Sequence, residues 1–195
     1  MEDLPALPQA LRKCLDTMPQ SLHEHTDRVM EIAVDLAGVH GADVDRTLLA
    51  AAGHDVSRAD SPDEWFRAAY EYGVTVGRAE ILVPVLLHGP VGAEWLRRHA
   101  DIADPDVLDA VRWHTTGTGD MSTVAKIVFL ADKLDPAKYR RYHFQTDVSE
   151  LATVDLDAAL LFFVSKEVQR LLRRRPPQAV HSEMLNFYNS LLTTT

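Results

Sequence analysis

The sequence predicts an all-α protein, a single domain built as a bundle of about eight or nine helices. Apolar residues recur at the three- and four-residue spacing of amphipathic helices through most of the chain. No segment shows a convincing period-two alternation of apolar and polar residues, which would predict a strand. The length of 195 residues suits one domain with a sizeable core.

The first elements are predicted from proline content and helix-start signals. Residues 1–20 carry scattered prolines, so we expect a loose arm or a short helix before a helical domain at residues 21–195. The run Ser21-Leu22-His23-Glu24 has the spelling of a capping box and predicts the start of the first long helix. Gly38 or Gly41 is expected to end that helix.

The later elements follow from the same start and stop signals. Pro84 interrupts the apolar stretch 79–88, so a kink or break is expected there, and His88-Gly89-Pro90 predicts a turn. A charged connection is expected at 137–150, and Pro176-Pro177 is expected to break the chain after the helix at 155–173. The remaining helices are expected at 45–55, from Ser61-Pro62 onward, at 90–99, 105–114, 122–135 and 182–192.

Composition excludes several classes of protein. The 29 acidic against 20 basic residues give a net charge of −9, which argues against a nucleic-acid-binding surface. The single cysteine, Cys14, excludes a disulfide scaffold and a cysteine-rich zinc site. The acidic first residues are unlike a signal peptide, and no apolar run is long enough to span a bilayer. We therefore expect a cytoplasmic protein with no membrane partner.

The histidines and two aspartates fall at informative places. His25 lies in the first turn of a helix, His54-Asp55, His88 and His114 each close an apolar stretch, and Asp132 lies inside an apolar helix. Neutral imidazole together with carboxylate suits Mn, Fe, Zn or a similar divalent ion. Six ligands exceed what one tetrahedral zinc needs and suit two metals that share a carboxylate.

Such a site has a clear chemical use. Two divalent cations offset by two aspartates leave a local positive site inside an acidic protein, which would bind phosphate oxygens. The cations would also lower the pKa of a bridging water, so that a metal-bridging hydroxide attacks phosphorus. A single histidine at a helix end is more often a surface or helix-dipole residue, so the hypothesis depends on the whole set. We assign that ordinary role to most of His23, His40, His99, His143 and His181, and expect at most one of His23 and His25 to face the site.

The ordered set His25, His54-Asp55 and Asp132 resembles the signature of HD-domain metal-dependent phosphohydrolases. Longer strings are similar to the YqeK-type HD proteins over roughly residues 20–190. These strings are Glu24-His25-Thr26, 86–93 (LLHGPVGA), 113–117 (WHTTG), 127–132 (IVFLAD) and 155–161 (DLDAALL). This sequence departs from the family at Gly53, where a larger apolar residue is common, and in the basic aromatic stretch 139–143. That stretch could cover a bound nucleotide, although such a stretch is more often simply a solvated loop.

The resemblance implies a symmetrical diadenosine tetraphosphate hydrolase that releases two ADP and uses two metal ions, with Fe ahead of Mn or another transition metal. It implies that the first metal is held by His25, His54, Asp55 and Asp132, and that Asp55 bridges to a second metal held also by His88 and His114. His25, His88 and His114 are then expected to border the substrate as well. Arg58, where the family usually has Lys, is expected to grip phosphate alongside Asp55 in catalysis. Thr115 and Thr116 are expected to contact phosphate or ribose.

Two alternatives stay open. Another HD phosphohydrolase activity, on nucleoside monophosphates, cyclic dinucleotides or a guanosine alarmone, would use the same metal set. A non-catalytic nucleotide-binding module with a structural metal belongs to a different class and would retain metal and nucleotide without hydrolysis. The apolar face of 156–172 would pack internally or form a homodimer, and internal packing is the commoner case.

Overall fold

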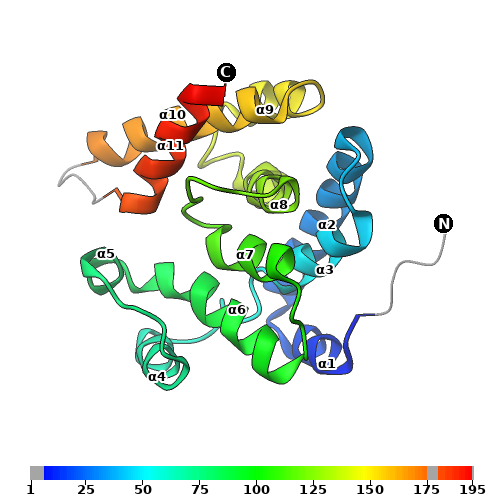
Figure 1. The fold of residues 1–195 in the computed structure, drawn as a ribbon, viewed down its shortest axis with the longest axis vertical. Coiled ribbons are helices and arrows are strands. Elements are labelled where there is room, and N and C mark those ends of the chain that lie inside the picture. Colours follow the sequence, from blue (N-terminus) through cyan, green and yellow to red (C-terminus); the bar gives the residue numbers. More distant parts are fainter. Residues whose placement is uncertain (1–6, 175–179, 195) are drawn as a thin grey trace.

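The computed structural model describes residues 7–174 and 180–194, and it confirms the all-α class (Figure 1). The described residues contain no strand. Their helices are α1 (Gln9–Thr17), α2 (Gln20–His40), α3 (Val44–Gly53), α4 (Pro62–Tyr72), α5 (Arg78–Leu82), η1 (Pro84–Leu87), α6 (His88–His99), α7 (Pro105–Trp113), α8 (Thr123–Leu134), η2 (Pro136–Lys138), α9 (Gln145–Ala152), α10 (Leu156–Arg173) and α11 (Ser182–Thr194). None of these helices is both long and apolar enough to cross a membrane.

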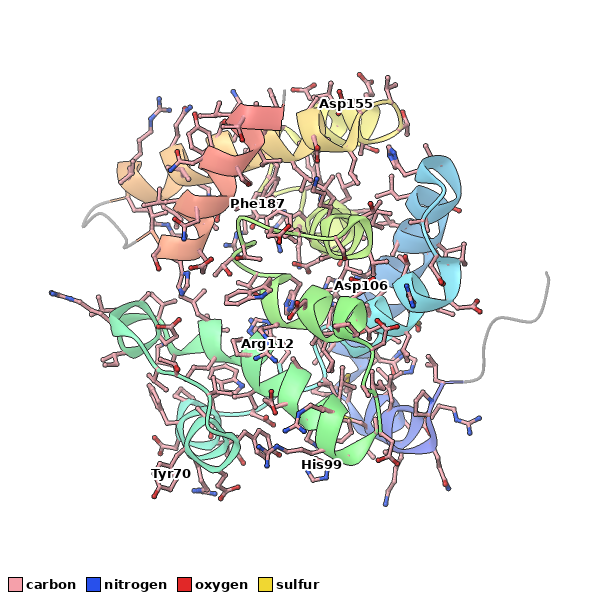
Figure 2. All side chains as sticks on the ribbon, in the orientation of Figure 1. Tyr70, His99, Asp106, Arg112, Asp155 and Phe187 are labelled. Carbon is pink, nitrogen blue, oxygen red and sulfur yellow. The ribbon has the colours of Figure 1, made fainter. Side chains whose placement is uncertain are left out.

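Helix α8 lies at the centre of the fold. Ten of its twelve residues are buried, and α2, α3, α7, α9 and α10 pack against it (Figure 1). Phe129 of α8 makes edge-to-face ring contacts with Phe163 of α10 and Phe187 of α11. Phe187 is labelled in Figure 2. A helix buried over most of its surface leaves little room for an unpaired charge, so the surroundings of the buried Asp132 on α8 decide what this residue does.

Helices α4 to α6 form a second, smaller apolar cluster around Trp65, Ala69, Leu87 and Val91. The start of α4 has the predicted capping box between Ser61 and Glu64, with proline at the first helical position. The break expected at Pro84 is also present: α5 ends at Leu82, and η1 leads directly into α6.

Three local expectations were wrong. The capping box expected at Ser21 does not form, because the N-cap of α2 is Pro19, two residues earlier, and Ser21 already lies inside the helix. The turn expected at 88–90 is helical: His88 is the first residue of α6, and Pro90 lies in its first turn, where a missing N–H costs nothing. The connection 137–150 contains η2 and α9, a short helix without a side-chain cap that could announce it.

The ends of the chain are described in part. Within residues 1–20 the short-helix alternative is the one observed, because α1 buries Leu11 and Leu15 against the core. The break expected at Pro176-Pro177 lies outside the described residues. Helices α1 and α9 raise the number of α-helices in the described part to eleven, two more than the upper sequence expectation. The apolar face of 156–172 packs into the core through Leu160 and Phe163.

Candidate metal centre

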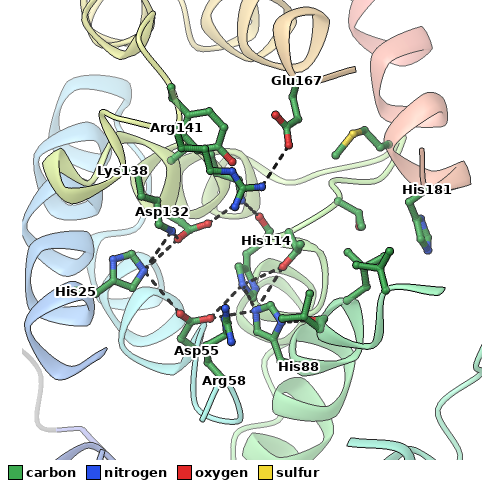
Figure 3. Close-up of a pocket in the computed structure, with 18 of the residues that line it drawn as sticks. His25, Asp55, Arg58, His88, His114, Asp132, Lys138, Arg141, Glu167 and His181 are labelled. Carbon is green, nitrogen blue, oxygen red and sulfur yellow. Dashed lines mark hydrogen bonds and ion pairs between the residues drawn. The ribbon is translucent and has the colours of Figure 1, made fainter. Parts of the chain in front are cut away.

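The structure brings the six predicted metal ligands together from five helices, and Figure 3 labels all of them except His54. His25 comes from α2, His54 and Asp55 from the end of α3, His88 from the start of α6, His114 from the end of α7 and Asp132 from α8. All six are buried. The starts of some helices, the ends of others and the interior of α8 thus direct polar side chains into one place. The positions of these residues in the sequence had suggested this.

Asp55 lies between two groups of imidazoles. Its Oδ1 is 3.0 Å from Nε2 of His88 and 3.5 Å from Nε2 of His114. Its Oδ2 is 3.5 Å from Nε2 of His54 and 3.7 Å from Nε2 of His25. The two oxygens of one carboxylate therefore face two separate pairs of nitrogens, and each set of three residues has the spacing of a metal site.

The other ring nitrogen of each histidine is already bound. Nδ1 of His54 donates to the carbonyl of Ala51, and Nδ1 of His114 donates to that of Val111, both at 2.7 Å. Nδ1 of His88 likewise donates to the carbonyl of Val85. Because a carbonyl can only accept, the proton of each neutral ring sits on Nδ1 and the lone pair of Nε2 faces the site.

The facing lone pairs indicate the kind of ligand that the site suits. Nε2 of His88 and Nε2 of His114 are 2.9 Å apart, and Nε2 of His25 and Nε2 of His54 are 3.3 Å apart. Two acceptors at this distance repel each other unless a proton or a cation lies with them. The donor set of imidazole nitrogens and carboxylate oxygens fits a divalent metal, and metal-binding histidines usually donate their second nitrogen as these do.

The pKa shifts agree with neutral rings and an ionised carboxylate. Burial lowers the pKa of His54, and it lowers the pKa of His114 to about 4. Burial alone would raise the pKa of Asp55, but the neighbouring His54, His114 and His88 outweigh it and hold that pKa well below its usual range. Both forms are the ones that bind metal.

His25 differs from the other rings because carboxylates face both of its nitrogens. Nε2 is 3.1 Å from Oδ1 of Asp132, and Nδ1 is 2.5 Å from Oδ2 of Asp135. Burial lowers the pKa of His25, but the hydrogen bonds to these two carboxylates outweigh it, and the net pKa is raised. A metal at this position would therefore compete with a proton.

Asp132 has two ammonium partners that sequence reasoning missed. Lys133 lies 2.8 Å from its Oδ2, and Lys138 contacts its Oδ1. Burial would raise the pKa of Asp132, but Lys133, Lys138 and His25 hold it well below its usual range. Oδ1 also faces Nε2 of His54 at 3.8 Å, so it borders the first histidine pair. Lys133 directly follows Asp132 in the sequence, and this adjacency could have indicated an ion pair between them.

The cluster opens into a cavity of about 660 Å³. Its wall includes five of the six predicted metal ligands, His54 being the exception, together with Arg58, Thr115 and Thr116. Thr115 places its hydroxyl 3.1 Å from Nε2 of His114, whereas the buried hydroxyl of Thr116 donates to the carbonyl of Gly117. Six cationic side chains line the same cavity: Arg58, Lys133, Lys138, Arg141, Arg170 and Arg174. A positively lined cavity in an acidic protein suits a polyphosphate.

Several of these lining residues were not predicted. Glu167 of α10 is buried in the wall, where it pairs with Arg170 at 2.5 Å and with Arg141 at 3.5 Å. Arg141 belongs to the stretch 139–143 that was noted as a possible cover, but α10 gave no sequence signal beyond its amphipathic pattern. His181 also lines the cavity and pairs with Glu80.

The other four histidines lie elsewhere. His23 pairs with Asp27 on the surface of α2, so only His25 of that helix faces the cluster. His40 donates to the carbonyl of Ala152, and His99 lies beside Tyr72. His143 is exposed. Gly53, the departure before the His54-Asp55 pair, has a packing reason: a Cβ there would lie 2.7 Å from Cδ1 of Leu96.

The fold and the histidine–aspartate cluster define the class, and sequence comparison supports it. The HD-domain family model matches residues 22–137. A symmetrical bis(5'-nucleosyl)-tetraphosphatase of Halalkalibacterium halodurans is 34% identical over 186 residues, which are 94% of this chain and 96% of the relative. The protein of that name from Bacillus subtilis is 30% identical over 95% of this chain and 97% of its own length.

A solved structure agrees. It is described as a "predicted HD superfamily hydrolase involved in NAD metabolism" from Clostridium acetobutylicum, and it has a TM-score of 0.88 and 25% identity over 96% of this chain and 97% of its own. This chain belongs to the HD-domain family and, within it, to the family of symmetrical bis(5'-nucleosyl)-tetraphosphatases.

Proposed function

We propose that the protein is a metal-dependent phosphohydrolase that cleaves diadenosine tetraphosphate symmetrically to two ADP. The observation that carries this is the pair of donor clusters that share Asp55 and open into a cavity lined by cationic side chains. The relatives from two organisms, matched over nearly the whole chain, are named for this activity, and their name supplies the substrate.

We assign the six residues to two divalent metals. The first metal would be held by His25, His54, Asp55 and Asp132, and the second by Asp55, His88 and His114. Bound there, the metals supply Lewis-acid stabilisation of the phosphate oxygens and lower the pKa of water. We propose iron as the physiological metal, with manganese as a substitute, because imidazole and carboxylate suit both.

The chain's own residues bind and orient the tetraphosphate. The guanidinium of Arg58 lies at the cavity wall, is exposed and has no ion-pair partner in the described part of the chain, so it is available for two phosphate oxygens. The hydroxyl of Thr115 sits beside Nε2 of both His88 and His114, where it would contact the phosphate next to the bond that breaks. We assign this contact to Thr115 rather than to Thr116, whose hydroxyl is bound to the backbone. Because ADP is a reasonably good leaving group, the cluster has little need of a strong general acid.

The test is a product analysis. The protein loaded with Mn²⁺ or Fe²⁺ is incubated with diadenosine tetraphosphate, and the nucleotides are separated by chromatography. ADP as the only product supports the proposal, provided that Asp55→Ala abolishes it. Release of ATP plus AMP, or no turnover by a fully loaded wild-type protein, would overturn it. Elemental analysis of the protein purified without added metal tests the assignment of iron.

We also place the protein in the cytoplasm, with nucleotides rather than nucleic acid as its ligands. The free thiol of the single cysteine, Cys14, is consistent with a reducing compartment. Fractionation of the source cells, followed by detection with an antibody, tests this location.

A further inference from the structure

The ammonium of Lys138 lies against two of the four side chains assigned to the first metal. It contacts Oδ1 of Asp132 and lies 3.4 Å from Nε2 of His25. These two atoms are themselves 3.1 Å apart and belong to the donors assigned to the first metal. One cation of the chain thus rests on the donors that would bind another cation.

Lys133 contacts the same carboxylate in a different way. Its ammonium takes the other oxygen, Oδ2, and is also held by the carbonyl of His114 and by the ring of Phe129, 4.1 Å away. The Lys133 side chain is 7% exposed, against 30% for Lys138. Both lysines line the cavity, but its additional contacts hold the buried Lys133 in place, whereas the more exposed Lys138 can move further into the cavity.

A divalent cation at Oδ1 of Asp132 would displace Lys138. Two positive charges that share one oxygen repel strongly in a buried site, and the divalent ion binds the donors better than an ammonium. The four-carbon stem of lysine allows its head to swing into the cavity. The acidic side chain across the cavity, Glu167, is already paired with Arg141 and Arg170, so a phosphate is the anion best placed to receive the released ammonium.

We propose that Lys138 alternates between two partners, Asp132 in the metal-free protein and a substrate phosphate once the first metal is bound. This assignment rests on the proposed function for the identity of the phosphate. The first metal binds less tightly because it must displace Lys138 from Asp132, which costs free energy. A phosphate that accepts the released ammonium offsets this cost. Metal and nucleotide therefore strengthen each other's binding through Lys138, in addition to any direct contact between them.

The test uses Lys138→Met, which keeps the length of the side chain and removes its charge. Metal-stripped protein is titrated with Mn²⁺, and free Mn²⁺ is followed by electron paramagnetic resonance. One of the two equivalents is expected to bind about tenfold more tightly than in the wild type, and the other to remain unchanged. ADP is then titrated into the Mn²⁺-loaded protein by calorimetry, and its affinity is expected to fall about tenfold. The opposite signs of the two changes are the signature of the alternation.

Two further variants complete the design. Lys166→Met removes an exposed ammonium of α10 that has no contact with the cluster, and it should change neither affinity. Lys138→Arg keeps the charge and should restore most of the ADP affinity. The proposal is overturned if both Mn²⁺ equivalents shift together, if Mn²⁺ binds no more tightly in Lys138→Met, or if ADP affinity is unaffected. Because Mn²⁺ binding is read without turnover, these results stand apart from any failure to hydrolyse diadenosine tetraphosphate.

Discussion

Oδ2 of Asp135 lies 2.5 Å from Nδ1 of His25, 110 residues away in the sequence, and accepts a hydrogen bond from it. The other oxygen, Oδ1, pairs with Arg28 at 2.7 Å and accepts the N–H of Ala137 at 3.0 Å. Asp135 is 1% exposed, and the pairs with His25 and Arg28 hold its pKa below the usual range although burial raises it. The carboxylate therefore fixes the ring of His25 with Nε2 directed at Asp132 and His54.

We predict that Asp135→Asn weakens binding of one metal by roughly 10- to 100-fold. Loss of the hydrogen-bond partner of a metal-binding histidine typically lowers metal affinity by this factor. The measurement is a Mn²⁺ titration of the stripped protein. Asp27→Asn is the matched control, since Asp27 faces Nδ1 of His23 at 3.1 Å on the surface of the same helix. An equal loss in both variants, or none in Asp135→Asn, would contradict the role given to Asp135.

Asp55→Asn should affect both metals, because its two oxygens face the two histidine pairs separately. We expect the loaded protein to retain less than one metal per chain and its hydrolysis of diadenosine tetraphosphate to fall more than about 100-fold. His88→Ala is the comparison, since it removes a donor from one cluster alone and should leave close to one metal. Metal content by elemental analysis and ADP release by chromatography check both. Two metals retained in Asp55→Asn would show that this carboxylate does not bridge.

Gly89→Ala should damage both stability and the site. A Cβ at Gly89 would lie 2.7 Å from the carbonyl oxygen of Arg112, so α6 and α7 would have to separate. This close approach places Nε2 of His88 2.9 Å from Nε2 of His114. We expect a loss of about 1–3 kcal/mol in the free energy of unfolding, together with weaker metal binding.

The control for this prediction is Gly38→Ala. Gly38 lies inside α2, and no atom lies within 4 Å of the place that a Cβ would take, so alanine should stabilise the protein by about 0.5–1 kcal/mol. Urea denaturation followed by circular dichroism measures both variants. A neutral Gly89→Ala would mean that α6 and α7 tolerate separation.

The stability of metal-free protein should depend on pH through His114. Burial lowers the pKa of His114 to about 4, whereas an unfolded histidine has a pKa of about 6.5. Because the pKa is lower in the folded state, His114 contributes up to about 3 kcal/mol to the free energy of unfolding. That contribution is complete above pH 6.5 and is lost as the pH falls towards 4. We expect His114→Asn to flatten this part of the stability profile in urea titrations. His143→Gln, an exposed histidine, should leave the profile unchanged.

Arg58→Ala should weaken substrate binding without loss of metal. Its guanidinium borders the cavity and has no ion-pair partner in the described residues, so its removal leaves no buried charge uncompensated. We expect KM to rise about tenfold, the loss of a charge-assisted contact, with an unchanged melting temperature. Arg67→Ala on the exposed face of α4 is the control. An unchanged KM would remove Arg58 from the substrate contacts.

The sequence by itself determined the helical class and the positions of most helix ends. Amphipathic spacing and caps such as those of Ser61, Ser122 and Asp155 act within four residues, so they can be read locally. The four histidines and two aspartates could be chosen as candidate metal ligands because they lie at the ends of apolar helices or inside one, where burying a polar side chain costs free energy unless it is paired or bound to a metal. Local signals also misplaced the start of α6 and overlooked α9, which its tertiary contacts stabilise.

Only the tertiary structure decided which atoms face one another. The pairs His25–Asp135, Lys138–His25 and Lys133–His114 join residues between 19 and 113 positions apart. No local pattern encodes such pairs, because they arise when α8 and η2 pack against α2 and α7. Burial then sets the protonation of the rings, and packing directs their free nitrogens at one another, which is the arrangement that suits a divalent metal.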